Sequence, residues 1–147
     1  MKRNNMETRE IIFRALTIDT NEWVEGDLIH GVGAKNGRMY ILPRIKNFAY
    51  VKTEAKPHDL DGYEVQESSI SQFTGLTDKN GVRIFEHDII SFGKTKKYYV
   101  LHNKGAFYLY HKDGLKDYDG TDYCWGLLNR AWQIDFEVEV IGNIYEA

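Results

Sequence analysis

Turn signals recur along the chain and divide it into short apolar segments. Each signal is a Gly that follows Asn, Asp or Lys, and together they are Asn36-Gly37, Asp61-Gly62, Asn80-Gly81, Lys104-Gly105, Asp113-Gly114 and Asp119-Gly120. Such pairs supply the positive φ angles that hairpin turns need. Many short strands with closely spaced turns are typical of a mainly β barrel or sandwich.

The segments between these turns have the character of strands. Residues 98–101 and 106–110 are apolar and flank Asn103-Lys104-Gly105, which predicts a hairpin. Residues 136–140 alternate apolar and acidic, a pattern that buries one face of a strand. Helical periodicity is confined to residues 126–133, which are long enough for two turns at most.

We therefore predict a mainly β fold with at most one short helix. Residues 67–147 are expected to form a small barrel-like unit, SH3-like or related, and residues 1–66 to add strands as an N-terminal β segment or lobe. Whether the two parts are separate or one compact domain stays open, because residues 53–66 are polar but only weakly linker-like. The expected core consists of Phe73, Leu76, Ile84, Phe85, Ile89, Val100, Phe107, Val138, Val140 and Ile144.

Charge is unevenly distributed along this acidic chain, whose formal net charge is -3. Residues 30–57 carry six cations against one anion, a net of +5, and residues 113–147 carry eight anions against two cations, a net of -6. This asymmetry is compatible with two solvated faces, with head-to-tail pairing of subunits, or with a basic binding face.

The cysteine count and the hydropathy point to a reducing compartment. Cys124 is the single cysteine, which excludes an internal disulfide and a cysteine-based metal cage. The basic residues near the N-terminus precede no apolar run, and no stretch approaches the roughly 18 apolar residues of a membrane helix. We expect a cytoplasmic protein without a membrane partner.

Two acidic stretches follow the same pattern. Residues 23–29 and 84–90 both read apolar, apolar, acid, any residue, Asp, apolar, apolar. Asp suits a chain corner because its short side chain accepts hydrogen bonds from turn amides. We therefore interpret Glu86 and Asp88 as residues that shape the backbone rather than react, and we expect a shared local geometry in the two stretches.

Three segments carry a more specific signal. They are residues 9–15 (REIIFRA), residues 72–81 (QFTGLTDKNG) with the IFE and DII that follow, and residues 140–146 (VIGNIYE). Together they resemble the YopX-like family, small proteins encoded by bacteriophages and prophages. The resemblance implies a mainly β fold and a phage or prophage setting in a bacterial host cell, and it implies no established reaction.

The chain departs from the usual pattern of the family at two positions, and its other motif residues are expected to be structural. The family's usual glycine between Glu86 and Asp88 is His87 here, which would be a poor residue at a positive φ. Leu16 stands where an aromatic residue usually follows Ala15. We assign structural roles to Phe73, Thr74, Gly75, Leu76, Asp78, Asn80, Gly81, Glu86, Asp88, Gly142 and Asn143.

The polar residues form no recognisable catalytic, metal or cofactor motif. For the acidic residues 113–122, aligning Gly120 to the sixth position of a calcium loop puts Leu115 and Gly126 where the first and last ligands belong. His102 and His111 lie on the two strands of the predicted hairpin and could approach each other, but no third ligand is evident. We expect no catalytic residue, no metal and no cofactor, and the pattern leans against an enzyme.

Two binding hypotheses remain. A non-enzymatic binding or assembly module would form homo-oligomers through exposed edge strands or through the opposed charged segments. Alternatively, cations and aromatic rings interleave in residues 38–52, as in β proteins that bind single-stranded nucleic acid. The candidates for that nucleic-acid face are Arg38, Tyr40, Arg44, Lys46, Phe48, Tyr50 and Lys52. An amphipathic strand with its rings turned inward would give the same pattern.

Overall fold

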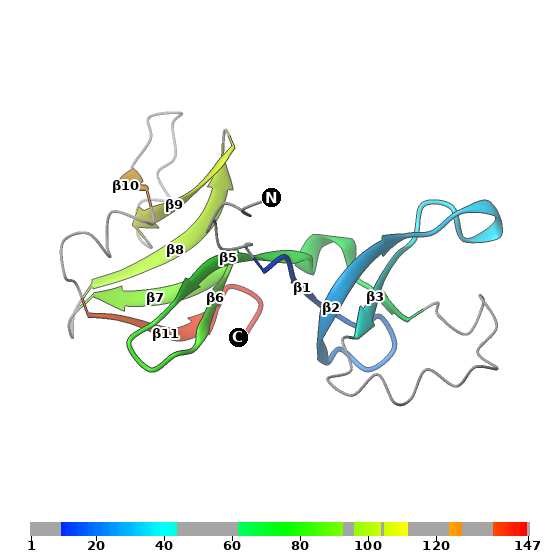
Figure 1. The fold of residues 1–147 in the computed structure, drawn as a ribbon, viewed down its shortest axis with the longest axis horizontal. Helices are drawn as coiled ribbons and strands as arrows, with labels where there is room; N and C mark the ends of the chain where they lie inside the picture. The colour runs from blue at the N-terminus through cyan, green and yellow to red at the C-terminus, as the bar shows by residue number, and fades with distance from the viewer. Residues whose placement is uncertain are drawn as a thin grey trace, which may run out of the picture.

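The computed structural model describes residues 10–43, 62–92, 96–103, 105–111, 124–127 and 137–146. In that part of the chain the regular elements are eleven strands and two single-turn 3₁₀ helices, so the predicted mainly β fold is confirmed. The strands form two antiparallel sheets, and β1 and β5 cross the narrow middle of the elongated molecule (Figure 1). Among these residues no helix is both long and apolar enough to cross a membrane.

The first sheet has six strands in the order β4-β3-β2-β1-β5-β6. Their bounds are β1 Phe13–Leu16, β2 Trp23–His30, β3 Met39–Pro43, β4 Tyr63–Val65, β5 Ser71–Thr77 and β6 Arg83–Phe85. The 3₁₀ helix η1 (Gly33–Lys35) lies between β2 and β3, and η4 (Glu67–Ser69) leads into β5. Strand β1 pairs with β2 over its whole length but with β5 only at Phe13 and Arg14. That short pairing connects strands β1–β4, which precede residue 66 in the sequence, to strands β5 and β6, which follow it. The predicted division of the chain into two parts at residue 66 stays a prediction.

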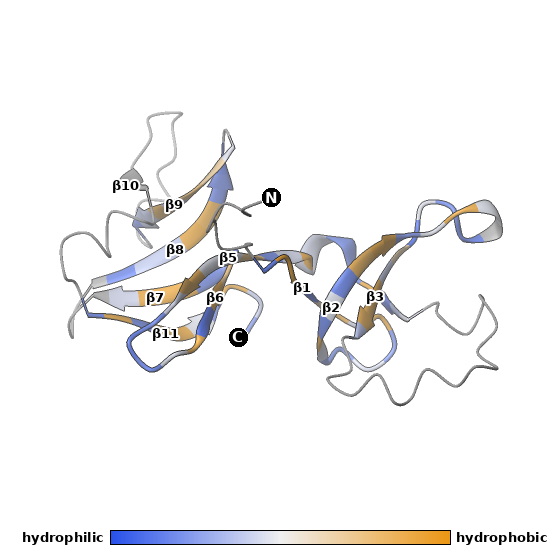
Figure 2. Ribbon diagram, in the orientation of Figure 1, coloured by the Kyte–Doolittle hydropathy of each residue, from blue (hydrophilic) through white to orange (hydrophobic). Residues whose placement is uncertain are grey.

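The second sheet has five strands in the order β10-β9-β8-β7-β11. Their bounds are β7 Asp88–Phe92, β8 Lys96–Asn103, β9 Ala106–His111, β10 Cys124–Leu127 and β11 Val138–Asn143. The register of β8 with β9 runs from Tyr98 opposite His111 to Asn103 opposite Ala106, which confirms the predicted hairpin. Hydrophobic residues occupy the middle of β8 and hydrophilic ones its ends (Figure 2).

Neither sheet closes into a barrel within the described residues, so the barrel-like part of the prediction is not confirmed. The nearest approach to closure lies in the N-terminal half rather than in residues 67–147. There Thr17 forms an isolated bridge with Val65, and the Ile18 and Gln66 amides donate to the Glu64 and Leu16 carbonyls. This single bridge brings β4 back beside the end of β1 without a strand ladder.

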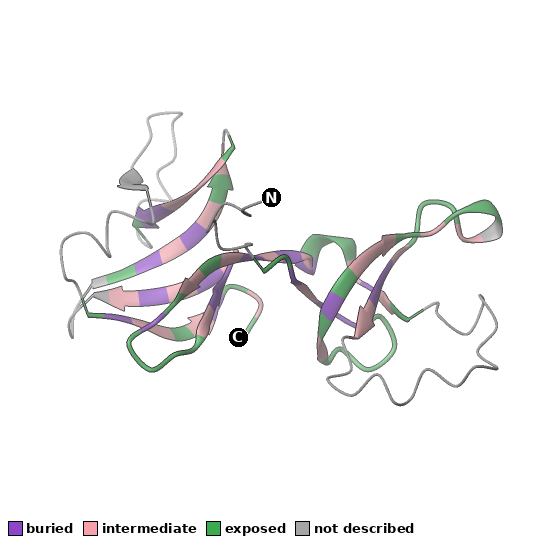
Figure 3. Cartoon of the chain, viewed as in Figure 1, coloured by how far each residue is buried: buried purple, intermediate pink, exposed green. Residues whose placement is uncertain are grey.

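The core is divided between the two sheets (Figure 3). The predicted residues Phe73, Ile84, Phe85, Val100 and Val138 are buried, whereas Leu76, Phe107 and Val140 pack partly buried at the margin. Two expectations were wrong: Ile90 rather than Ile89 is fully buried, and Ile144 is exposed. The alternation of side chains along β7 explains the first error, because only every second side chain faces the core and Ile90, not Ile89, is one of them.

Of the local predictions, the turn glycines are confirmed, whereas the shared geometry of the two acidic stretches is not. Gly37, Gly62, Gly81 and Gly105 all take positive φ, as their turn signals predicted. Two of the residues in the predicted helix, Gly126 and Leu127, belong to β10, and the others lie outside the described residues. The echo between residues 23–29 and 84–90 does not reflect a shared geometry, because Asp27 lies inside β2 while Asp88 follows a turn.

Candidate functional site: the junction of the two sheets

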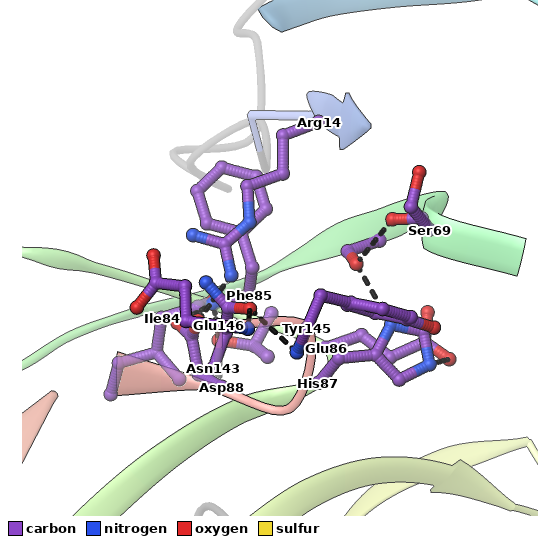
Figure 4. A network of polar contacts seen from close by, with 12 residues as sticks. Arg14, Ser69, Ile84, Phe85, Glu86, His87, Asp88, Asn143, Tyr145 and Glu146 are labelled. Carbon is purple, nitrogen blue, oxygen red and sulfur yellow. Dashed lines mark hydrogen bonds and ion pairs between the residues drawn. The ribbon is translucent and has the colours of Figure 1, made fainter. Parts of the chain in front are cut away.

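The three sequence segments that stood out meet where the two sheets join (Figure 4). The side chains that gather there are Arg14 from β1, Glu86 and His87 from the turn between β6 and β7, Asp88 from β7, and Tyr145 after β11. Ser71 from β5 joins them, with its hydroxyl oxygen 2.8 Å from His87 Nδ1. We refer to these six residues as the junction cluster. It brings together residues that are up to 131 positions apart in the sequence.

A buried ion pair forms the centre of the junction cluster. The Arg14 guanidinium donates through Nη2 to Asp88 Oδ1, and the two side chains are only 14% and 1% exposed. The guanidinium carbon lies 4.8 Å from the ring centre of Trp23 and 4.5 Å from that of Phe85. The faces of aromatic rings attract a cation, so these contacts offset part of the hydration free energy that the buried Arg14 guanidinium has lost.

Asp88 also shapes the backbone, as the sequence predicted. Its Oδ2 accepts a hydrogen bond of 2.8 Å from the Phe85 amide, which closes the corner between β6 and β7. Burial raises the pKa of Asp88 above its ordinary value, while Arg14 and the Phe85 amide offset part of that effect. Among the described residues, Arg14 Nε is buried without a hydrogen-bond partner.

His87 occupies a left-handed backbone position, with φ of 71°. Its amide donates to the Val100 carbonyl of β8 at 2.7 Å, and its carbonyl accepts from the Ile144 amide at 3.0 Å. Few residues other than glycine adopt this φ, because the Cβ atom crowds the following carbonyl. The position therefore does take the positive φ at which His was expected to be a poor residue, and the contacts of its ring can offset that cost.

The His87 imidazole has a hydrogen-bond partner at Nδ1 and an acidic neighbour at Nε2. Nδ1 lies 2.8 Å from Ser71 Oγ, and Nε2 lies 3.6 Å from Glu86 Oε2. Burial lowers the pKa of His87, Glu86 opposes that shift, and Arg14 adds to it. The imidazole is thus held largely neutral near pH 7.

Serine, histidine and glutamate in a row invite comparison with a hydrolase triad, but the geometry serves a different purpose. The Ser71 side chain is fully buried, and its hydroxyl is placed to donate to the Ser69 carbonyl at 2.9 Å. Ser69, equally buried, accepts from the Leu16 amide and donates to the Gln66 carbonyl. A nucleophile must reach its substrate, so Ser71 is a link in a structural chain of hydrogen bonds.

The C-terminal turn completes the junction cluster. Asn143 Oδ1 accepts from the Tyr145 amide at 2.9 Å and from the Glu146 amide at 3.2 Å, as its predicted structural role requires. The Tyr145 hydroxyl donates to the Ser68 carbonyl, and its ring meets the rings of Trp23 and His87 edge to face. Burial, with a contribution from Glu86, raises the pKa of Tyr145.

A second carboxylate, that of Asp78, holds the β5–β6 hairpin against the other sheet. Oδ1 accepts from the Asn80 and Val82 amides at 2.8 and 2.9 Å, and Oδ2 accepts from the Val140 amide of β11 at 3.0 Å. Burial raises the pKa of Asp78, but these three amide bonds and Lys79 outweigh it, so the pKa lies below its ordinary value. Asp78 is therefore a buried anion that serves two elements at once.

The other predicted structural residues shape the same hairpin. Thr74 Oγ1 donates to the Ile84 carbonyl at 2.7 Å, and Gly75 takes a φ of 87° where the β5–β6 register shifts. Gly142 is extended and lies at the register shift between β11 and β7. Glu86 contributes through its amide, which donates to the Gln72 carbonyl at 2.9 Å.

The predicted nucleic-acid face is described only at its start. Arg38 is exposed and lies 3.8 Å from Glu64, whereas Tyr40 is only 7% exposed, with the Lys35 ammonium over its ring. Tyr40 therefore faces inward, as the amphipathic-strand alternative expects. Nucleic-acid binding stays a prediction, because its other candidates lie outside the described residues: Arg44, Lys46, Phe48, Tyr50 and Lys52.

The described histidines and acids do not converge on a metal. His102 pairs with Phe107 and His111 with Tyr98, so the two imidazoles do not face each other across the hairpin. Within the described ranges no group of three or more His, Cys, Asp or Glu side chains is arranged to hold an ion. Residues 113–122, the irregular calcium-like stretch, lie outside those ranges.

Sequence reasoning missed Arg14, Ser71 and Tyr145 as members of the junction cluster, and it missed Ser69, whose carbonyl accepts from the Ser71 hydroxyl. Arg14 and Tyr145 lie within the segments that carry the family signal, which was the one hint available. Comparison with known families supports that signal: the family model described as YopX protein matches residues 12–147. No curated protein matches the chain.

Proposed function

The chain belongs to the YopX family, and we propose that it is a non-enzymatic binding or assembly module whose copies associate with one another. The observation that carries the proposal is how the buried acids of the family motif are used. Both oxygens of Asp78 and both oxygens of Asp88 accept hydrogen bonds from backbone amides or from Arg14.

Acid–base or nucleophilic chemistry would need a different arrangement. A catalytic carboxylate must exchange a proton with a substrate, so one of its oxygens has to be within reach of that substrate. Asp78 and Asp88 are buried, and replacing their partners by a substrate would leave amides or a guanidinium unsatisfied. The motif acids thus hold the backbone scaffold together, and the exposed surface is left to recognise partners.

Association is supported by apolar side chains near one corner of that scaffold. Val82 and Ile141 are 48% and 45% exposed. The Asp78 carboxylate binds the amides of both Val82 and Val140, so the hairpin turn lies beside the stretch of β11 that carries Ile141. Exposed apolar side chains on adjoining backbone segments favour contact with another protein.

The outer edge of β11 is poorly suited to pairing with a strand of another copy. The outward Val138 carbonyl and Val140 amide are already bound by the Lys79 amide and by Asp78 Oδ2. A covered edge cannot pair with a further strand. The predicted pairing of copies therefore proceeds through side chains at this corner, together with the opposed charged segments.

Light scattering coupled to gel filtration, over a range of protein and salt concentrations, tests the proposal. We expect a mass that is a multiple of the 17.1 kDa chain. Ile141→Glu, alone and with Val82→Glu, is expected to shift the mass to that of one chain, whereas Val32→Glu, at an 81% exposed site near η1, should not. A wild-type chain that is monomeric under every condition would contradict the proposal.

A further inference from the structure

We propose that His87 is the pH-responsive element of a latch, in which the C-terminal turn of residues 144–146 is fastened to the sheet junction when the imidazole is neutral and released when it is charged. This inference is independent of whether copies of the chain associate. It rests on the contacts that this one residue makes with three parts of the fold.

His87 fastens the C-terminal turn through its backbone and through its ring. Its carbonyl accepts from the Ile144 amide at 3.0 Å, and its ring meets the Tyr145 ring at a centroid distance of 5.4 Å. Tyr145 in turn reaches Trp23 of β2 at 6.1 Å and donates its hydroxyl to the Ser68 carbonyl in η4. Moving the imidazole therefore disturbs a ring that reaches from the β6–β7 corner to the first sheet.

Burial favours the neutral imidazole, whereas the hydrogen-bond partners of the ring can serve either form. The Ser71 hydroxyl can donate to Nδ1 of the neutral ring, or it can donate to the Ser69 carbonyl and accept from Nδ1 of the charged ring. The charge of the imidazolium would stay largely out of water in the fastened state, with Glu86 Oε2 3.6 Å from Nε2. The side chain is only 16% exposed, and rotation toward solvent would hydrate the charge.

The charged groups around the imidazole determine the direction of the response. Glu86 in the same turn favours the imidazolium, and Arg14 of β1 disfavours it. Asp88 of β7 is committed to Arg14, and Glu146 of the C-terminal turn acts on Asp88. Tyr145 stays neutral below pH 8 because its pKa is raised. Ser71 of β5 and the Val100 carbonyl of β8 carry no charge. His87 is thus the member of the cluster whose ordinary pKa lies nearest neutrality, and burial lowers that pKa in the fastened state.

The sign of the effect follows from linkage. The released turn leaves the imidazole hydrated, with a pKa near its ordinary value of 6.5, whereas burial holds the pKa of the fastened state lower. The open state therefore binds the proton more tightly. Fastening is fully stable above pH 6.5 and weakens as pH falls through the pKa of the fastened state.

Amide hydrogen exchange of the full chain, followed by NMR and corrected for the pH dependence of intrinsic exchange, tests the latch. The Ile144 and Tyr145 amides are expected to lose protection between pH 7 and 5, while the Val100 and Leu109 amides of the second sheet keep theirs. His87→Asn accepts a positive φ and cannot be charged, so it should abolish this pH response. The matched control His102→Asn, at an exposed position of β8, should retain it.

A flat wild-type response, or an equal response in His87→Asn, would overturn the latch. If His87→Asn does not fold, the ring titration of His87 in the wild-type chain decides. Coincidence of that titration with the loss of Ile144 protection supports the latch, and titrations at separate pH values refute it.

Discussion

The Arg14 guanidinium and the Asp88 carboxylate form a buried ion pair that joins β1 to the start of β7 across 74 positions of the sequence. Because β1 also pairs with β2 and β5, this pair ties the middle of the first sheet to the second one. A buried pair of this kind contributes little net stability compared with apolar residues of the same size. Its effect is to specify how the two sheets are joined, since either charge alone would be costly.

Asp88→Asn tests that relationship. The Asn oxygen can still accept from the Phe85 amide, but the Arg14 cation loses its partner in a buried site. We expect a loss of about 3 kcal/mol in the free energy of unfolding, measured with urea. Adding Arg14→Met should recover part of it. Arg83→Met, which breaks an exposed pair with Glu10, is the control and should cost less than about 1 kcal/mol. Strictly additive effects of Asp88→Asn and Arg14→Met would argue against the pair.

Asp78→Ala is expected to destabilise the chain by about 3 kcal/mol, because three backbone amides lose a charged acceptor. Asp78→Asn keeps one carbonyl oxygen and should fall between the wild type and Asp78→Ala. Urea unfolding gives the ranking. Exchange of the Val140 amide shows whether the contact with β11 is lost, and unchanged protection in Asp78→Ala would contradict the assigned role.

Low pH should remove the stabilisation that the ionised Asp78 carboxylate gives to the folded chain. Its pKa in the folded chain lies below the ordinary value of 3.8, so the unfolded chain binds the proton more readily. The stabilisation is therefore complete above pH 3.8 and is lost as pH falls through the folded pKa. We expect the difference in unfolding free energy between wild type and Asp78→Ala to be constant from pH 7 to 5 and to shrink below pH 4. A constant difference down to pH 3 would show that the ionised form is not what matters.

The features that the sequence predicted correctly are those governed by local backbone rules. Gly81 takes its positive φ because the hairpin needs it, and Asp88 closes a corner because a short carboxylate can reach the amide three residues back. Asn80 shows the limit of such rules, since it does not take positive φ although the Asn-Gly pair suggested it. The turn bonds Gly81 to the Asp78 carbonyl and places only glycine in the left-handed region.

The features that the sequence could not predict depend on distant partners. Nothing near Arg14 in the chain shows that Asp88 neutralises it or that Trp23 and Phe85 cover it. Likewise, Asp27 and Asp88 occur in similar sequences, but Asp27 lies inside β2, whereas Asp88 follows a turn and meets the Arg14 cation of another strand. The same applies to the isolated bridge between Thr17 and Val65, which joins residues 48 positions apart in the sequence.

Substitutions at Gly81 and Gly26 distinguish the free-energy cost of a left-handed backbone from the cost of a steric clash. A Cβ at Gly81 would meet nothing within 4 Å, so Gly81→Ala should cost only the left-handed penalty of about 1 kcal/mol. A Cβ at Gly26 would lie 1.9 Å from the Leu42 carbonyl oxygen in the neighbouring strand, so Gly26→Ala must push β2 and β3 apart. We expect Gly26→Ala to be clearly the more destabilising in thermal unfolding. Equal melting temperatures would contradict the close approach of these strands.

Replacing His87 separates its backbone from its ring. His87→Ala and His87→Gly both remove the contacts with Ser71 and Tyr145, but only Ala keeps a Cβ atom at a φ of 71°. The Gly variant should therefore be more stable than the Ala variant by about 1 kcal/mol, as measured by urea unfolding at pH 7. At residue 102, in the regular strand β8, the same two substitutions should rank in the opposite order, because Gly weakens a strand. A His87→Ala variant as stable as His87→Gly would show that the turn relaxes out of the left-handed region, and that the ring contacts do not depend on it.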